Sequence, residues 1–208
     1  MSMKEDLSIE QIKASLGSLL LLWSRIERAV RDEVALFHEG HLPKSAHGIA
    51  AVLNAWEATV TCRTDALPLS VLLASTLRAQ LQDQLNIRNG LCHGVVGFSV
   101  AHGDRPATLT WELNGERRSI TLDELQATFS WLSKVPSAFS IISHSRSEGV
   151  GSRMTDNSEN RDWWKAEYGL SPWRPGTGVE SRLPPTGTDD LLSEGLTEAQ
   201  RGAEEPGR

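Results

Sequence analysis

Residues 9–37 read IEQIKASLGSLLLLWSRIERAVRDEVALF, and they carry the strongest periodic signal in the chain. Their apolar residues recur in steps of three and four, which places them on one stripe of an α-helix. Ser8 and Gln11 have the spacing of a capping box at its start, and Gly40 with Pro43 ends it. A helix of about 30 residues is roughly 45 Å long, more than a small core covers. We therefore expect part of the stripe to face a second subunit.

Two further helices are predicted downstream. Residues 47–62 repeat the helical spacing of apolar residues, and residues 69–95 do so over a longer stretch. Asp65 is the expected N-cap of the longer helix, with Pro68 in its first turn. This third helix is the second long element of the predicted bundle.

The end of the third helix is rich in glycine. Residues 86–97 read NIRNGLCHGVVG and contain Gly90, Gly94 and Gly97. A glycine in a helix interior lowers the stability of the helix by about 1 kcal/mol relative to alanine, so the presence of glycine at these positions needs an explanation. Gly90 and Gly94 are four residues apart, and we expect them to clear one face for another backbone or a ligand.

The hydrophobic period then changes to that of strands. Residues 107–113 and 117–122 are rich in Thr, Ile and aromatic residues, and they flank Asn114-Gly115. This dipeptide is the preferred pair of a tight hairpin turn. Residues 98–101 are an expected third strand.

A fourth helix follows the hairpin. Thr121 with Glu124 forms a second capping box, and Pro136 is expected to kink or end the helix before Ile142. The sequence thus predicts a mainly α domain over residues 1–144, a bundle of about four helices with a small β-hairpin inserted at about residues 97–122.

Residues 145–208 have a different composition. They hold more than half of the prolines and glycines of the chain and are net acidic, which is typical of a mostly disordered tail. Within them, residues 161–173 read RDWWKAEYGLSPW, with three of the seven tryptophans and the only tyrosine. The segment Trp163–Trp173 is interpreted as a docking segment that folds on a protein partner or back over the functional site, or as a marginal helix.

The composition limits the classes of partner. The chain of 208 residues has 21 Lys and Arg against 27 Asp and Glu, a net charge of −6, so any contact with nucleic acid must be local. Even an apolar run such as Leu19 to Trp23 is far below the ~20 residues of a membrane span. With two cysteines and no secretion signal at the start, we expect a cytoplasmic protein, with Cys62 and Cys92 in its core.

Arg88, Asn89 and His93 are the candidate catalytic residues. Asn89 and His93 share a helix face, and the long side chain of Arg88 begins about 140° round the axis from His93. An imidazole, a guanidinium and an amide can move a proton, hold a phosphate and orient a substrate without a metal. We expect all three to converge on one groove, and neither a metal nor a cofactor is implied.

This triplet resembles the R-N-x-x-x-H motif of HEPN domains. Its place near the end of a long helix, after an amphipathic first helix containing Trp23-Ser-Arg-Ile-Glu27, is also similar to that family. The resemblance covers roughly residues 8–144. It implies a helical bundle that forms a homodimer, in which two copies of the motif meet in a positively lined cleft.

Many members of that family are metal-independent ribonucleases that cleave RNA. They are frequently toxins or effectors of phage defence, often paired with an antitoxin such as a small nucleotidyltransferase, and others have lost activity. The resemblance implies that His93 is the general base toward a ribose 2′-hydroxyl and that Arg88 stabilises the pentavalent phosphate, while Asn89 orients one of them. A 2′,3′-cyclic phosphate is the implied product.

Each of these residues also has a purely structural reading. Gly90 is then a C-cap, Arg88 satisfies carbonyls of the last turn and His93 is buried. Glu27 is either an ion-pair partner of Arg88 or a solvated flank residue.

The hairpin and the histidines have alternatives too. The hairpin combines basic residues with an aromatic one: Arg105, Arg117 and Arg118 beside Trp111. This mixture is typical either of a surface that binds single-stranded RNA or of a solvated strand edge whose charges prevent aggregation. The remaining histidine cluster lacks ligand spacing and is interpreted as a surface loop. It consists of His38, His41 and His47.

The rival functions are a non-catalytic module that binds a protein partner and a nucleotide-binding protein. The G-x-x-x-x-G-K, G-x-S-x-G and H-E-x-x-H motifs do not occur in the sequence.

Overall fold

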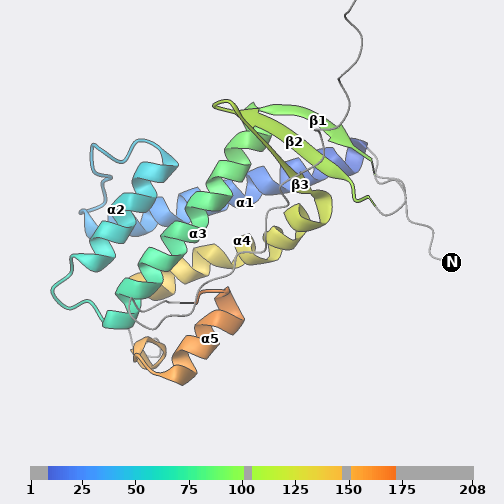
Figure 1. Cartoon of the computed structure of the whole chain (residues 1–208). Coiled ribbons are helices and arrows are strands. Elements are labelled where there is room, and N and C mark those ends of the chain that lie inside the picture. Colours follow the sequence, from blue (N-terminus) through green and yellow to red (C-terminus); the bar gives the residue numbers. More distant parts are fainter. Residues whose placement is uncertain (1–8, 101–104, 147–150, 172–208) are drawn as a thin grey trace, which may run out of the picture. The chain divides into compact units, whose positions relative to one another are not determined.

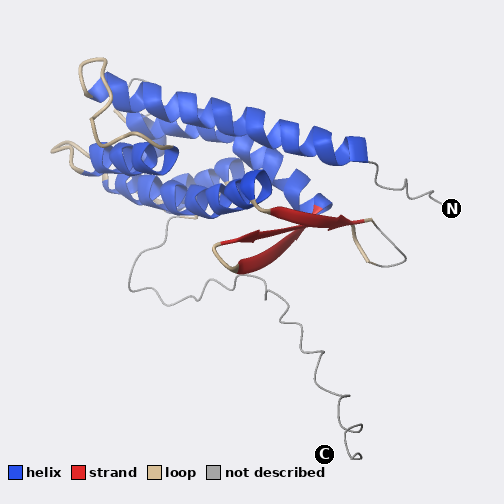
Figure 2. Ribbon diagram, turned by 90° about the horizontal axis from the view of Figure 1, so that it is seen from above, coloured by secondary structure: helices blue, strands red, loops and turns tan. Residues whose placement is uncertain are grey.

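Four long helices and a three-stranded sheet make up most of the computed structural model, which describes residues 9–100, 105–146 and 151–171 (Figure 1). The long helices are α1 (Ile9–Phe37), α2 (Ile49–Thr61), α3 (Pro68–His93) and α4 (Leu122–Ser143). The mainly α prediction is confirmed. In Figure 2 the strands lie at one end of the group of helices.

Most of the apolar stripe of α1 is covered within the chain. Trp23, Ile26 and Val30 are buried, because α2 and α4 pack along this helix. α4 follows α1 over most of its length, from Ser15 near Gln126 to Glu33, whose Oε2 lies 3.3 Å from His144 Nε2. The parallel partner α4 therefore covers most of the stripe, whereas Ile9 at its start is half-exposed. The expected contact of part of the stripe with a second subunit stays a prediction.

The start of α3 differs from the prediction in its cap. Leu67 is the N-cap and Pro68 is the first residue, as the proline predicts, but Asp65 does not cap the helix. Its two carboxylate oxygens accept hydrogen bonds from Arg63, each at 3.0 Å. A charged partner two residues away thus competes successfully with the helix N-terminus for this carboxylate.

The three strands form one antiparallel sheet in the order β1-β2-β3. They are β1 (Val95–Ser99), β2 (Thr108–Leu113) and β3 (Glu116–Thr121). Asn114 and Gly115 join β2 to β3 with φ angles of 56° and 79°, as a tight turn of type I′ requires. The predicted hairpin is confirmed. The expected third strand at residues 98–101 exists but lies earlier, at Val95–Ser99, so it takes the last residue of the predicted third helix, and residue 101 lies outside the described residues.

α4 begins with the predicted capping box. The Thr121 hydroxyl accepts from the Glu124 amide at 3.1 Å, and the Thr121 amide donates to Glu124 Oε2 at 2.8 Å. The Thr121 hydroxyl also donates to Glu124 Oε2 at 2.8 Å, and the two hydrogen bonds that this carboxylate accepts, first from the amide and then from the hydroxyl, lower the pKa of Glu124. Of the two expected effects of Pro136, a kink or an end before Ile142, the end is wrong, because Pro136 lies inside α4 and the helix continues to Ser143.

The helical packing continues beyond residue 144. A 3₁₀ turn, η1 (Gly151–Met154), leads to α5 (Ser158–Tyr168), which packs on α4 at a distance from the sheet (Figure 1). Met154, Trp164 and Leu170 are buried in the same core as the bundle.

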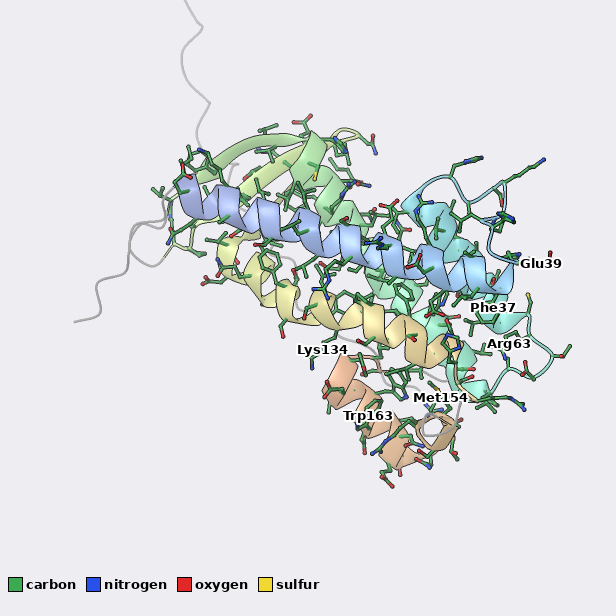
Figure 3. The ribbon with its side chains drawn as sticks, turned by 180° about the vertical axis from the view of Figure 1, so that it is seen from behind. Phe37, Glu39, Arg63, Lys134, Met154 and Trp163 are labelled. Atoms are coloured by element: carbon green, nitrogen blue, oxygen red, sulfur yellow. The ribbon has the colours of Figure 1, made fainter. Side chains whose placement is uncertain are left out.

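The domain boundary predicted after residue 144 therefore falls too early. In Figure 3, Met154 and Trp163 lie together beside α4, near Lys134, whose Nζ donates to the Glu167 carbonyl at 2.8 Å. The boundary was predicted from the polar average composition of residues 145–208. A few buried aromatic side chains are enough to pack part of this segment into the core, and the average does not show them. α5 does not cover the end of α3 that carries the motif, and Trp173 lies outside the described residues.

Candidate functional site

The last two turns of α3 carry the three predicted site residues. Arg88 and Asn89 are half-buried, and Arg88 Nη1 donates a hydrogen bond of 2.9 Å to Asn89 Oδ1. His93 is exposed in the final turn, and its side chain has no hydrogen bond or ion pair with the part of the chain that the structure describes. The imidazole is thus open to solvent, while the guanidinium is held in place.

Arg88 faces a small polar cavity between three helices. The cavity measures about 120 Å³ and is lined by Leu20, Trp23, Ser24 and Glu27 of α1, Ile49 of α2, and Leu85 and Arg88 of α3. Arg88 Nε and Trp23 Nε1 are buried, and neither has a hydrogen-bond partner among the described residues. Both N–H groups are donors only, so each can pair only with an acceptor that reaches it.

Glu27 shares this cavity with Arg88 but is paired elsewhere. Its Oε1 accepts from Arg31 Nε at 3.1 Å and from Nη2 at 2.8 Å. Of the two alternatives for Glu27, the ion pair with Arg88 is therefore not formed, and Glu27 pairs one turn away on α1 instead. As a result, Arg88 has no carboxylate to neutralise it among the ion pairs of the described residues.

His93 lies outside the cavity of Arg88. Five residues of helix turn the two side chains about 140° apart, and His93 is not among the lining residues. The structure thus brings Arg88 and Asn89 together and places His93 on a different side of the helix end. The structural reading, with a buried histidine and a cap at Gly90, is also wrong, since α3 continues to Gly94.

Gly90 and Gly94 are where the sheet contacts α3. A Cβ on Gly90 would overlap the Trp111 indole, and one on Gly94 would overlap the Glu112 carbonyl. Gly94 also accepts a hydrogen bond of 2.8 Å from the Glu112 amide. The expectation that these glycines admit another backbone is confirmed, and the strand that approaches is β2 of the same chain.

Alanine at Gly90 should therefore destabilise the protein. We expect Gly90→Ala to lower the free energy of unfolding by about 1–3 kcal/mol, because the indole must move. Gly17→Ala is the matched control: Gly17 is also helical, has nothing within 4 Å of an added Cβ, and should gain about 1 kcal/mol. Urea denaturation of both variants measures the difference, and equal shifts would contradict the packing argument.

The hairpin is less suited to RNA than the sequence suggests. Trp111 is buried against α3, so most of its ring is unavailable for stacking. Arg117 is exposed and Arg118 is paired with Glu116 at 2.7 Å, as expected for a charged, solvated strand edge. A cavity of about 230 Å³ nevertheless lies between the hairpin and α3. It is lined by Asn86, Trp111, Leu113, Asn114, Glu116 and Arg118.

Asn86 is the residue of this second cavity that sequence reasoning missed. It lies four residues before Gly90 and seven before His93, so it shares their face of α3. The spacing of Asn86, Gly90 and His93 is visible in the sequence. It points to a cavity only once β2 is known to pack against this face of α3.

The remaining candidates carry no site. Cys62 and Cys92 are exposed, so the expectation of buried cysteines is wrong; each occupies an outward position of its helix end. His38, His41 and His47 are exposed in the loop between α1 and α2. Within the described ranges, no group of three or more His, Cys, Asp or Glu side chains is placed to hold a metal.

None of the described helices has both the length and the hydropathy to span a bilayer. Comparisons of the chain with models of protein families, with curated proteins and with solved structures gave no match.

Proposed function

We propose that the protein is a metal-independent endoribonuclease of the HEPN type that acts as a homodimer, in the manner of toxins or effectors of phage defence. The observation that supports this most is the pairing of Arg88 with Asn89 at 2.9 Å one turn before a solvent-open His93. This gives a fixed cation and a free imidazole at one helix end.

In this proposal each residue has one task. His93 accepts the proton of a ribose 2′-hydroxyl, whose oxygen attacks the adjacent phosphorus. The bond from phosphorus to the 5′-oxygen breaks, the departing oxygen takes a proton, and a 2′,3′-cyclic phosphate remains. Arg88 stabilises the charge of the pentavalent phosphate, and Asn89 holds the guanidinium in orientation.

A second protomer is part of the proposal. Within one chain, Arg88 faces the cavity beside α1, whereas His93 lies outside it. A phosphate held by the Arg88 of one chain would meet the His93 of the other if two helix ends face each other.

The test is cleavage of single-stranded RNA by the purified protein. We expect cleavage that persists in EDTA, leaves a 2′,3′-cyclic phosphate detectable by mass spectrometry, and stops when the scissile nucleotide is 2′-deoxy. Arg88→Lys should reduce the rate about 10²-fold, the cost typical of one lost transition-state donor, because lysine cannot reproduce the guanidinium geometry. Cleavage of the 2′-deoxy strand, or inhibition by the chelator, would refute the mechanism.

A non-catalytic binding module is the second candidate. The divergence of Arg88 and His93 within one chain favours it, because a binding protein has no need to bring them together. A folded protein that cleaves none of a broad panel of RNAs, in the dimeric state, would support this candidate over the first.

A further inference from the structure

Strand β1 is an exposed edge of the sheet with an apolar surface. Its neighbour in the sheet is β2, and its other edge has no strand among the described residues. Four apolar side chains are about half exposed here: Val95 by 45%, Val96 by 55%, Phe98 by 51% and Val100 by 51%. The stretch 95–100 has no ionisable side chain.

The opposite edge, β3, is protected in the way that soluble proteins protect edge strands. Glu116, Arg117, Arg118 and Ser119 are all exposed on it. Charged residues on an edge prevent pairing with another chain, and β1 has none of them. A bulge between Val95 and Gly97 interrupts its first part, but Gly97 to Ser99 pair regularly with β2.

The pairing register places Phe98 on the core face of the sheet. Phe98 lies opposite Leu109, and Val95 lies opposite Trp111. Residues opposite each other on neighbouring strands share a face, and Leu109 and Trp111 are buried. The apolar layer therefore continues onto β1, where the helices of this chain no longer cover it.

Gly97 lies at the bulge of β1, where glycine is common, and no contact within the chain requires it. Gly90 and Gly94 are required by the close approach of β2, whereas a Cβ on Gly97 would meet nothing within 4 Å. Its φ angle is also outside the left-handed region, so the turn geometry does not demand glycine. A glycine in a strand marks a bulge or the close approach of another backbone, and the absence of a side chain at Gly97 leaves this part of β1 without bulk on that face of the sheet.

We propose that β1 pairs in antiparallel fashion with β1 of a second copy of this chain. Two chains of charge −6 repel each other over most of their surfaces, but an uncharged strand meets itself without a like-charge contact. Pairing across a two-fold axis uses the same patch twice and closes after two chains. The result is a six-stranded sheet with the charged β3 strands at both outer edges.

This dimer also places the two α3 ends near the shared interface. β1 begins two residues after His93, so the axis lies close to both helix ends. The pairing rests on the strand alone and does not depend on ribonuclease activity. A dimer without cleavage would support this inference and count against the proposed function, and a cleaving monomer would do the reverse.

Analytical ultracentrifugation of the full chain tests the pairing. We expect the wild type to sediment at twice the mass of one chain, and Phe98→Lys to sediment as a monomer with an unchanged far-ultraviolet circular dichroism spectrum. Ser119→Lys is the matched control, since it adds the same charge to the other edge strand and should remain dimeric. A monomeric wild type, or a Phe98→Lys dimer, would overturn the proposal.

Disulfide trapping keeps the test independent of the stability of the lysine variant. In a background of Cys62→Ser and Cys92→Ser, Gly97→Cys should form a cross-linked dimer on mild oxidation, because it lies near the middle of the paired strands. Ser119→Cys should not. Cross-linking at position 119 but not at 97 would show that another surface joins the chains.

Discussion

Replacing His93 by alanine is expected to reduce RNA cleavage by about 10²–10⁴-fold, the usual contribution of a general base. The loss should come without a loss of stability, because the imidazole is exposed and has no hydrogen bond or ion pair with the described residues. Replacing an exposed residue of this kind usually changes the free energy of unfolding by less than about 0.5 kcal/mol. Initial rates and urea denaturation of the same preparation measure the two effects.

His41→Ala is the control for this experiment. His41 is also an exposed histidine, but it lies in the loop between α1 and α2. Its removal should leave the cleavage rate unchanged. If His41→Ala and His93→Ala lose activity equally, or if neither does, His93 is not the base.

Trp164→Ala should lower the free energy of unfolding by about 3–5 kcal/mol, as for other buried tryptophans. Trp164 is fully buried, its ring centroid lies 4.9 Å from that of Tyr168, and its Nε1 donates to the Arg153 carbonyl at 3.1 Å. Truncation removes the ring and leaves that carbonyl without its partner. Urea denaturation followed by circular dichroism measures the loss.

Lys165→Ala provides the comparison on the same helix. Lys165 is exposed, so its replacement should change the stability by less than about 0.5 kcal/mol. A loss below about 1 kcal/mol for Trp164→Ala would mean that α5 does not share the core of the bundle.

The elements that the sequence predicted well have local causes. Asn114-Gly115 determines the hairpin because few residues adopt positive φ, and Thr121 with Glu124 determines the start of α4 through its own hydrogen bonds. The prediction that Asp65 caps α3 was wrong because its carboxylate pairs with Arg63, which is just as close in the sequence.

The sequence placed the candidate site residues at the end of one helix but did not predict how their side chains are arranged, and their role stays a prediction. The spacing of Arg88, Asn89 and His93 located the helix end, yet the direction of each side chain depends on what α1 and β2 contribute there. Gly90 is an example of what the sequence alone does not explain. A glycine inside a helix is unusual, but the reason for it, the contact with Trp111, is known only from the structure. α5 is a similar case: its buried residues Asn160, Trp164 and Tyr168 have helical spacing, but the sequence does not show that α4 is the surface they pack on.

The contact between Gly94 and Glu112 has a consequence for regulation. β2 is fastened to the last turn of α3, and β1 is fastened to β2, so the outer strand and the imidazole are parts of one mechanical unit. We therefore expect a molecule that binds the outer strand to restrict the last turn of α3, which carries His93, without touching the imidazole. Under the proposed function, such binding would alter RNA cleavage only if the bound and free strands hold His93 differently.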